Sequence, residues 1–579
     1  MRPLLWDHQP CDEAAASSLA DAAGIGVVTA RLLQQRGVTT PGEAARFLKP
    51  SLDHLHDPFA LSGMAVASAR ILGAIERRER VVIHGDYDAD GITSTVILER
   101  AIAALGGDVA HFIPERIRDG YGLQTAAVER LHAEGARLIV SVDCGIRSLE
   151  AARRAASLGV DLIVTDHHEP EGELPEALAV LNPKRPDCRY PDKNLAGVGV
   201  ALKLVHALCV KTGRESWLPG FVKIAAIGTL ADVVPLVGEN RVIAKVGLDL
   251  LSRGPHKVGL QALLEASGLS GRTIGSYHVS FVLAPRLNAA GRMATPDLAA
   301  RLLLASDEAQ VGEARALAAQ LTDENLRRQD EEQSVLKQAR SVIESDPDIG
   351  SHSVLVVGGE GWHRGVIGIV AAKLVETFYR PAVVVSLQDG VGHGSCRSIG
   401  AFDMLAALEA CGTHLARFGG HRMAAGLTVD AGAFKAFRAA LQAYGDEHLG
   451  PDDLRPRLRV DGRLDFDAIK GRLVEEVSAL EPFGIGNPRP VFCAGPVEVV
   501  DGPRRIKDRH LKMSLRHRGR IFRAMAWRAA EREPFVAANR GALDIAFSLA
   551  ENTFNGETHT ELTLADLRAP EAAPEVPAP

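Results

Sequence analysis

The sequence lacks the features that mark secreted, disulfide-bonded or membrane proteins. None of its seven cysteines forms a CxxC pair, which argues against a disulfide framework and against a thiolate zinc site. No run of about 18 apolar residues occurs, and the first residues, MRPLLWDHQPCDEAAASS, show no basic start followed by an apolar stretch. We therefore expect an unexported, cytoplasmic protein without a membrane segment.

The chain also lacks an excess of positive charge. Its 66 Lys and Arg against 73 Asp and Glu give a formal net charge of −7, so any attraction to nucleic acid must come from local basic patches. Its 579 residues, of which 46% are hydrophobic, exceed the size of one hydrophobic core and are ordinary for a globular protein. The composition predicts about three or four packed domains.

The order of apolar and polar residues predicts an α/β fold. From residue 71 to 296, short β-branched runs alternate with helical stretches, which is typical of a parallel sheet covered by helices. The clearest strands are RVVIH (80–84), RLIVSV (137–142) and DLIVTD (161–166), and we expect helices at 92–105 and 221–234. Residues 1–70 are predicted to form short helices with loops, to which we assign no function.

Four further regions follow the first domain. Alternating charges and few helix breakers predict a long connecting helix at 297–345. Residues 346–450 alternate again and predict a second, smaller α/β domain. Short alternating runs at 455–567 are typical of a small β-barrel, and the Pro/Ala-rich tail at 568–579 is expected to be disordered.

Side chains that bind metals follow three predicted strands. The segment HGDYDADG (84–91) lies between a strand and a helix, Asp143 follows the second strand, and DHH (166–168) follows the third. Because ligands bind where the strands of an open α/β sheet end, these groups should meet at one edge. Each Asp alone could instead cap a helix. Together, at least four aspartates and two histidines would repel one another unless cations bind between them.

The donor set indicates which metals would bind. Carboxylate oxygens with fewer imidazole nitrogens and no thiolate favour Mn²⁺ or Mg²⁺ over structural zinc. Two such ions, about 3.5 to 4 Å apart, suit phosphoester hydrolysis, because one activates a water and both stabilise charge on the phosphate oxygens. The sequence therefore predicts a two-metal phosphoesterase.

Four motifs resemble the DHH phosphoesterase superfamily in order: HGDYDADG, VDCG, DHH and GTLADVVPL. The resemblance implies one ion held by His84, Asp88 and Asp143, and a second held by Asp90, Asp143, His167 and Asp232. It implies that Asp143 bridges the ions, that His168 acts near the scissile phosphate, and that Asp166 orients its neighbours. Asp86 has no ligand role in this pattern.

The second α/β region resembles the DHHA1 substrate-binding domain through GHGSCRSI (392–399) and FGGHRMAAG (418–426). In a glycine-rich turn, Arg397 with Ser395 and Ser398 could bind a terminal phosphate; the alternative is a solvated surface arginine. For His421 we expect a substrate contact, and the alternative is a packed histidine.

Five further segments resemble the RecJ family of single-strand-specific exonucleases: PERIRDGYGL, LAGVGVALKL, PRLNAAGRM, GWHRGVIGIVAAKL and EPFGIGNPRPVF. The resemblance implies 5′→3′ degradation of single-stranded DNA in repair and recombination, and an OB-type barrel. The implied 5′-phosphate contacts are Arg116, Ser395 and Arg397, and the implied strand contacts are Arg286, Asn288, Arg292, His363 and Arg364. Arg292 and Arg364 could equally be surface ion-pair partners.

The predicted barrel carries the positive charge that the whole chain lacks. Residues 504–523 contain nine Lys or Arg against one Asp, which would attract phosphates. Phe522 and Trp527 could stack on bases, although such residues more often belong to a core. We expect single-stranded DNA as the partner of a monomeric enzyme, with a single-strand-binding protein and a helicase as further partners.

Two other functions stay open on sequence alone. A phosphodiesterase for short oligonucleotides or cyclic dinucleotides would use the same metal site but would not need a basic barrel. An inactive DHH scaffold protein in replication would have lost metal ligands, whereas all the expected ligands are present. The sequence therefore favours an active exonuclease.

Overall fold

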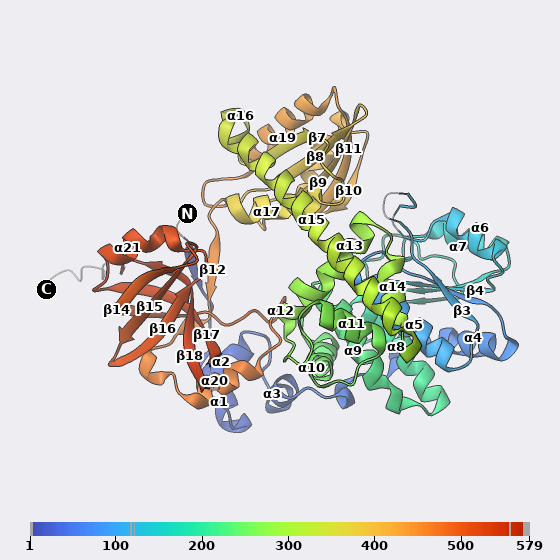
Figure 1. Ribbon diagram of the computed structural model, residues 1–579, viewed down its shortest axis with the longest axis horizontal. Helices are drawn as coiled ribbons and strands as arrows, with labels where there is room; N and C mark the ends of the chain where they lie inside the picture. The colour runs from blue at the N-terminus through green and yellow to red at the C-terminus, as the bar shows by residue number, and fades with distance from the viewer. Residues whose placement is uncertain (1–3, 116–117, 121, 555–556, 571–579) are drawn as a thin grey trace.

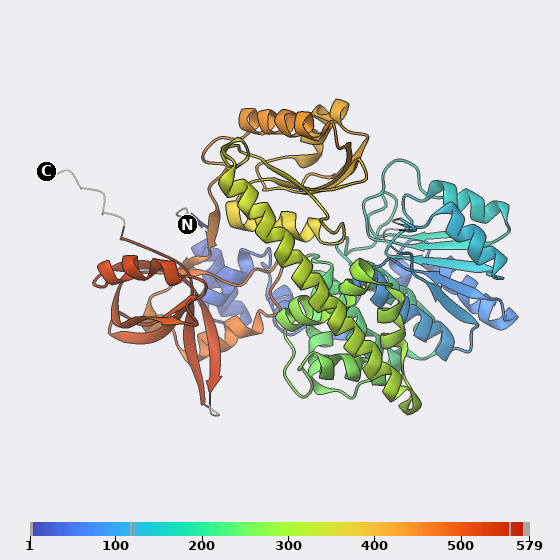
Figure 2. The ribbon, with the colours of Figure 1, turned by 45° about the horizontal axis from the view of Figure 1, so that its top comes forward.

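The computed structural model of the chain describes residues 4–115, 118–120, 122–554 and 557–570. The chain forms three bodies: the first α/β domain, the second α/β domain and the barrel (Figure 1). One long helix, α15 (Val311–Ser345), runs from the first α/β domain to the second (Figure 2). The expected α/β architecture with a terminal barrel is confirmed.

The first domain is built on a parallel five-stranded sheet in the order β3-β2-β4-β5-β6. Its strands are β2 (Val81–His84), β3 (Val109–Phe112), β4 (Leu138–Val142), β5 (Asp161–Thr165) and β6 (Ala179–Leu181). β2 and β4 are buried throughout, as expected for strands covered on both faces. Because all five strands are parallel, their carboxyl ends lie at one edge, where the motif residues begin.

Helices cover both faces of this sheet and form two hydrophobic cores. On one face lie α6 (Thr125–Ala133) and α7 (Leu149–Ser157). The larger core contains α4 (Met64–Arg77), α5 (Ala89–Ala104), α8 (Gly197–Thr212), α9 (Leu218–Ala231), α10 (Gly238–Arg253), α11 (Val258–Ala266), α13 (Ala284–Met293) and α14 (Asp297–Leu304). Between α11 and α13 come α12 (Ser276–His278) and the π-helical turn η4 (Val279–Leu283). The region expected as one connecting helix thus contains α14 and then α15.

The second domain has a mixed five-stranded sheet in the order β10-β11-β9-β8-β7. Its strands are β7 (Leu355–Glu360), β8 (Ala382–Gln388), β9 (Val391–Arg397), β10 (Arg417–His421) and β11 (Ala424–Asp430). Its helices are α16 (Pro347–Gly350), α17 (Ile367–Phe378), α18 (Met404–Ala410) and α19 (Phe434–His448). One face packs on α17 and the end of α15, and the other on α18 and α19.

The C-terminal region forms a closed sheet in the order β13-β14-β15-β16-β18-β17, with β14 also paired to β17. Its strands are β13 (Gly462–Arg463), β14 (Phe492–Ile506), β15 (His510–His517), β16 (Arg520–Ala526), β17 (Leu543–Phe554) and β18 (Glu557–Arg568). Two helices, α20 (Gly471–Ala479) and α21 (Glu533–Ala538), accompany it. Closure removes the free sheet edges.

The N-terminal segment packs on the barrel region, far away in sequence. β1 (Leu5–His8) pairs with β12 (Arg457–Val460). The helices α1 (Glu13–Ala23), α2 (Val27–Gln34) and α3 (Pro41–Leu48) share one hydrophobic core with α20 and the barrel strands. Glu476 of α20 accepts hydrogen bonds from the Gly26 N–H at 2.9 Å and the Thr29 hydroxyl at 2.6 Å. These residues complete the barrel's core.

In the part of the chain that the structure describes, no single helix is both long and apolar enough to span a membrane. Two sharply bent helix pairs near the N-terminus pass the same test on length and composition alone.

Candidate metal centre

The first motif forms a tight turn between β2 and α5. Asp88 is the N-cap of α5, and its carboxylate accepts the Asp90 N–H at 2.9 Å and the Gly91 N–H at 3.1 Å. A Cβ at Gly91 would lie 2.5 Å from the carbonyl oxygen of Asp86, so only glycine fits there. The helix cap proposed as an alternative to metal binding is therefore present, and it turns Asp86, Asp88 and Asp90 toward one edge.

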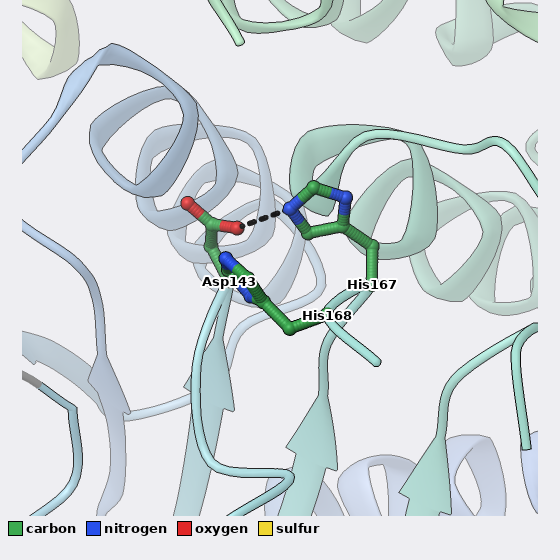
Figure 3. A group of neighbouring side chains, drawn as sticks. All are labelled: Asp143, His167 and His168. Atoms are coloured by element: carbon green, nitrogen blue, oxygen red, sulfur yellow. Dashed lines mark ion pairs between the residues drawn. The ribbon is translucent and has the colours of Figure 1, made fainter. Parts of the chain in front are cut away.

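The strand ends bring three overlapping groups of ligand atoms together. In each group the atoms lie within 4.8 Å of one another. Asp143 and His167 each take part in two of them, and Figure 3 shows these residues facing each other beside His168. The groups are Asp86 with Asp88 and Asp143, Asp90 with His167 and Asp232, and Asp143 with His167 and His168.

The polar atoms at the centre of these groups are buried without hydrogen bonds. Among the residues that the structure describes, Asp143 Oδ1, His167 Nε2 and Asp232 Oδ2 have no hydrogen-bond partner, although His167 Nε2 lies 3.2 Å from Asp143 Oδ1 and 3.6 Å from Asp232 Oδ2. Leaving a buried polar atom unpaired costs about 1–3 kcal/mol. Carboxylates and imidazoles converging on a space without their own hydrogen bonds fit a pair of divalent cations with oxygen and nitrogen ligands.

Burial and mutual repulsion shift the pKa values of these groups. Burial, with repulsion from neighbouring carboxylates, raises the pKa of Asp90 and Asp143 well above normal and that of Asp232 to about 8. Burial lowers the pKa of His167 to about 3. A neutral imidazole can bind a metal, and cations would offset the repulsion among the carboxylates.

The backbone at the start of α8 holds the Asp90 carboxylate and packs closely against Asp143. The Gly197 and Val198 N–H groups, at the start of α8, each donate to the Asp90 carboxylate at 2.7 Å. A Cβ at Gly197 would lie 2.3 Å from Asp143 Oδ1. Asp143 itself has a φ of +60°, an unfavourable conformation for a residue with a side chain. The site therefore depends on close approach of α8 to the sheet.

Asp166 orients the histidines of the third motif. One carboxylate oxygen accepts His168 Nδ1 at 2.7 Å and the backbone N–H of His167 at 2.7 Å, and the other accepts the Ile146 N–H at 2.9 Å. Burial opposes ionisation of Asp166, but its hydrogen bonds prevail and lower its pKa. Burial also opposes protonation of His168, yet Asp166 raises the pKa of that imidazole. This geometry suits a positioning role for Asp166.

His84 and Asp86 differ from the pattern that the resemblance implies. His84 is fully buried with its Nε2 unpartnered, and burial lowers its pKa to about 4, but it joins none of the three groups among the described residues. Asp86, to which we assigned no ligand role, is a member of the group with Asp88 and Asp143. A third carboxylate within HGDYDADG was the signal for it in the sequence.

Three residues expected to contact the strand also make contacts within the protein. Asn288 accepts the Ala89 N–H at 2.7 Å and so supports the first turn of α5. Arg292 donates to the Gly365 carbonyl at 3.0 Å, across to the second domain. Arg286 donates to the Val282 carbonyl at 2.7 Å. Their roles toward DNA stay predictions.

The second domain places its expected phosphate contacts on β9 and beside the start of α17. Arg397 lies 3.4 Å from the Ser395 hydroxyl and donates to the Cys396 carbonyl at 2.8 Å. A Cβ at Gly368, in the first turn of α17, would lie 3.0 Å from Ser395 Oγ. A guanidinium, a hydroxyl and a helix N-terminus thus meet, which favours an anion.

The other residues of this domain that we expected to contact substrate do not lie together at the Arg397 site. Ser398 is buried and its hydroxyl donates to the Phe402 carbonyl at 2.8 Å, inside the domain. His363 Nδ1 accepts the Gly365 N–H at 3.0 Å. Arg364 and His421 are exposed. The expectation for Arg116 lies outside the described residues.

An exposed aromatic pair lies beside the Asp232 loop and was not singled out in the sequence. Tyr277 and Phe281 are 66% and 69% exposed, and their rings stack with centroids 5.1 Å apart. Between them, the Ser280 hydroxyl donates to the Leu230 carbonyl at 3.0 Å, two residues before Asp232. In the sequence, the spacing of four residues between Tyr277 and Phe281 could have indicated that the two rings lie side by side on one helix face.

The chain matches known domains along most of its length. Residues 80–229 match the DHH family N-terminal domain, residues 351–445 the DHHA1 domain, and residues 460–566 the RecJ OB domain.

Curated relatives and solved structures agree with these matches. The single-stranded-DNA-specific exonuclease RecJ of Bacillus subtilis is 38% identical over 97% of this chain and 70% of that protein. RecJ of Escherichia coli is 36% identical over 84% and 86%. The crystal structure of Thermus thermophilus RecJ with Mn²⁺ covers 98% of this chain and 80% of that one, with 34% identity and a TM-score of 0.83; the Mg²⁺ complex gives 0.77. This chain belongs to the RecJ family of DHH proteins.

Proposed function

We propose that this protein is a single-stranded-DNA-specific exonuclease that hydrolyses phosphodiester bonds in the 5′→3′ direction with two Mn²⁺ or Mg²⁺ ions, in DNA repair and recombination. The observation that carries the proposal is the group of buried, unpartnered ligand atoms around Asp143 and His167. Relatives at 31–38% identity are named single-stranded-DNA-specific exonucleases, and two crystal structures of Thermus thermophilus RecJ are complexes with Mn²⁺ and with Mg²⁺.

The residues of the metal centre would have two roles, metal binding and hydrogen bonding to the substrate. Asp88, Asp90, Asp143, His167 and Asp232, with Asp86 or His84, would hold the ions. When bound, the ions supply positive charge and an activated water. Asp166 keeps the imidazole of His168 beside Asp143, where it can donate a hydrogen bond to the scissile phosphate or the leaving oxygen.

The second domain would select the end of the strand. Ser395, Arg397 and the first turn of α17 supply donors for a terminal phosphate that no nucleotide precedes. Arg292 on α13 donates a hydrogen bond to this domain. This contact helps to fix the position of the anion site relative to the metal site. A 5′-phosphate bound there would direct the adjacent phosphodiester toward the ions.

The barrel would hold the strand behind the cut. Lys512, Ser514 and Arg516 alternate on the exposed face of β15, and Arg523 is paired with Ser514 on the neighbouring strand β16. Lys512 and Arg523 form no ion pair among the described residues, so they stay free for phosphates. The exposed Tyr277 and Phe281, beside the loop that follows α9, offer ring faces suited to stacking on bases.

We further propose that the enzyme works as a cytoplasmic monomer alongside a single-strand-binding protein and a helicase. An enzyme that needs a free single-stranded 5′ end depends on proteins that unwind and protect such strands. Sedimentation at micromolar concentration is expected to give a single species of 61.7 kDa.

One experiment tests the function against its rivals. End-labelled single strands, duplexes and dinucleotides are incubated with the protein and Mn²⁺, with and without chelator. We expect mononucleotides from single strands but not from duplexes, little cleavage of dinucleotides, and no products with chelator. Preferential dinucleotide cleavage would indicate an oligonucleotide phosphodiesterase, and no cleavage would indicate an inactive scaffold.

A further inference from the structure

The loop between α9 and α10 begins at the expected ligand Asp232 and then leaves the core of the first domain. Asp232 directly follows α9, and the next residue, Val233, has a φ of +64° and is 62% exposed. A β-branched residue rarely adopts this conformation, so the surrounding contacts must hold the loop in it. Farther along, Leu236 is buried, and its N–H donates to the Ile485 carbonyl at 2.7 Å.

Ile485 belongs to a tight turn in the segment that leads into the barrel. Gly484 and Asn487 exchange two backbone hydrogen bonds, at 2.9 and 3.1 Å, and Gly486 has a φ of +72°. The side-chain amide of the fully buried Asn487 donates to the Leu480 carbonyl at 2.7 Å and the Pro482 carbonyl at 2.9 Å. The turn is therefore rigid, and its apex carbonyl faces the Asp232 loop.

Two arginines fix this turn to its surroundings. Arg36, from the N-terminal segment, donates to Asn487 Oδ1 at 2.7 Å and to the Pro488 carbonyl at 2.6 Å. Arg241, from α10 and only 2% exposed, donates to the carbonyls of Phe47 at 2.7 Å and Glu481 at 3.1 Å. The N-terminal segment, the barrel-side turn and the metal-bearing domain thus meet at one buried junction.

The same loop is tied on its inner side to the backbone that holds Asp90. The Asn240 side chain donates to the Pro235 carbonyl at 3.1 Å and accepts the Ala196 N–H at 3.3 Å. Ala196 directly precedes the two N–H groups that hold the Asp90 carboxylate. A shift of the loop would therefore reach both Asp232 and Asp90, which share one ligand group.

We propose that the Gly484–Asn487 turn is a positioning element for Asp232, so that cation affinity in the first domain depends on the segment leading into the barrel. The proposal rests on the metal centre of the proposed function. It also gives the N-terminal segment a role, because Arg36 fixes the turn from behind. The turn touches no reacting atom, and its effect should appear in cation affinity before turnover is measured.

The test compares two glycines that share a backbone conformation. A Cβ at Gly486 would lie 3.2 Å from Pro235 Cβ and 3.3 Å from Val237 Cγ1, whereas Gly271 has the same φ of +72° and nothing within 4 Å. Mn²⁺ is titrated into full-length wild type, Gly486→Ala and Gly271→Ala, and free Mn²⁺ is followed by electron paramagnetic resonance. We expect Gly486→Ala to weaken one of two Mn²⁺ sites about 10-fold, and Gly271→Ala to match wild type.

A second pair avoids left-handed glycines and decides the matter if Gly486→Ala does not fold. A Cβ at Gly484 would lie 2.8 Å from Leu236 Cδ1, and one at Gly541 would meet nothing within 4 Å. We expect Gly484→Ala, but not Gly541→Ala, to weaken Mn²⁺ binding. Fluorescence anisotropy of a labelled single strand in chelator should be the same for each variant and its control, because the barrel face is unaltered.

Isotherms of Gly486→Ala and Gly484→Ala that superimpose on those of their controls would overturn the positioning role. Absence of any Mn²⁺ site in wild type would overturn both this proposal and the proposed function. If wild type binds Mn²⁺ but leaves single-stranded DNA intact, the exonuclease function fails, and the isotherms still decide whether the turn positions Asp232.

Discussion

The metal edge and the basic face of the barrel handle charge in opposite ways. At the metal edge, Asp143 and His167 are buried and Asp232 is half-buried, and within the described part of the chain their central atoms have no hydrogen-bond partner. On the barrel, the cations are exposed, and several pair with acids of the same domain. Those pairs are Arg504 with Asp501, Arg505 with Glu533, Arg516 with Glu498, and Arg518 with Asp465.

This difference shows what each region contributes. Buried charges that stay unpaired are costly, so they persist where a ligand compensates for them, and the chemistry depends on a few fixed positions. Exposed charges act through their sum and are screened by salt, so no single one is decisive. We therefore expect single substitutions to have large effects at the metal edge and small effects on the barrel.

The largest effect is expected from Asp88→Asn. An asparagine can still accept the N–H groups at the start of α5, so the helix cap stays while one charge of the Asp86, Asp88 and Asp143 group is lost. Turnover on single strands should fall on the order of 10³-fold, with little change in unfolding temperature in chelator. Retention of full turnover would mean that Asp88 is only a cap.

His111 is a half-buried charge that has ionic partners within the protein, unlike the unpartnered atoms at the metal edge. His111 lies 2.7 Å from Glu99 and 3.0 Å from Asp297, with Arg301 acting on Asp297. Burial opposes its protonation, but the two carboxylates raise its pKa from 6.5 to about 9. A histidine whose pKa is raised on folding stabilises the protein fully below pH 6.5, and this contribution is lost as pH rises through about 9.

His111→Gln removes that titration. We expect wild type to exceed the variant by about 3 kcal/mol at pH 6, an excess that disappears above pH 9. Unfolding midpoints across this range provide the measurement, and turnover at the metal edge should be unaffected. A stability difference that does not vary with pH would show that His111 is not charged in the folded protein.

Arg397→Ala tests whether the second domain binds the strand end. Loss of charge-assisted hydrogen bonds of about 1.5–3 kcal/mol should lower kcat/KM on 5′-phosphorylated strands about 10- to 100-fold. Strands with a 5′-hydroxyl serve as the control, because they lack the group that Arg397 would bind. An equal loss on both substrates would place Arg397 in the structure of the domain rather than in the anion site.

The smallest effect is expected on the barrel face. Replacing Lys512 and Arg523 by Gln should weaken binding to a single strand several-fold and reduce the slope of log affinity against log salt by about 0.7 per cation. Arg504 and Arg516 lie on the same face but already pair with acids. Replacing them should change the slope less, and equal changes from both pairs would show that the ion pairs do not matter.

The sequence predicted the metal edge well because its residues follow the strands of a parallel sheet. Once β2, β4 and β5 were recognised, the position of Asp143 and His167 at one edge followed from topology. The sequence could not show whether Asp88 caps α5 or binds a metal, because one carboxylate can do both. It gave Asp86 no ligand role and did not predict that its carboxylate lies close to those of Asp88 and Asp143, because distances within a tight turn are not visible in a motif.

The sequence did not predict the packing between segments that are far apart in the chain. The N-terminal helices share a core with the barrel region, and their hydrogen bond from Thr29 to Glu476 spans 447 residues; nothing in the pattern of these helices indicates the partner. The basic run at 504–523 was found, but its partial neutralisation by Glu498 and Asp465 depends on how separate segments pack together. Contacts between distant segments have no local signal.

Crystals grown with Mn²⁺ and measured at its absorption edge would test the account most directly. If the cluster binds a pair of cations, two anomalous peaks should appear about 3.5–4 Å apart, both within coordination distance of the Asp143 carboxylate. A single peak elsewhere, or none beside Asp143 and His167, would contradict the claim that this buried cluster exists to bind a pair of cations.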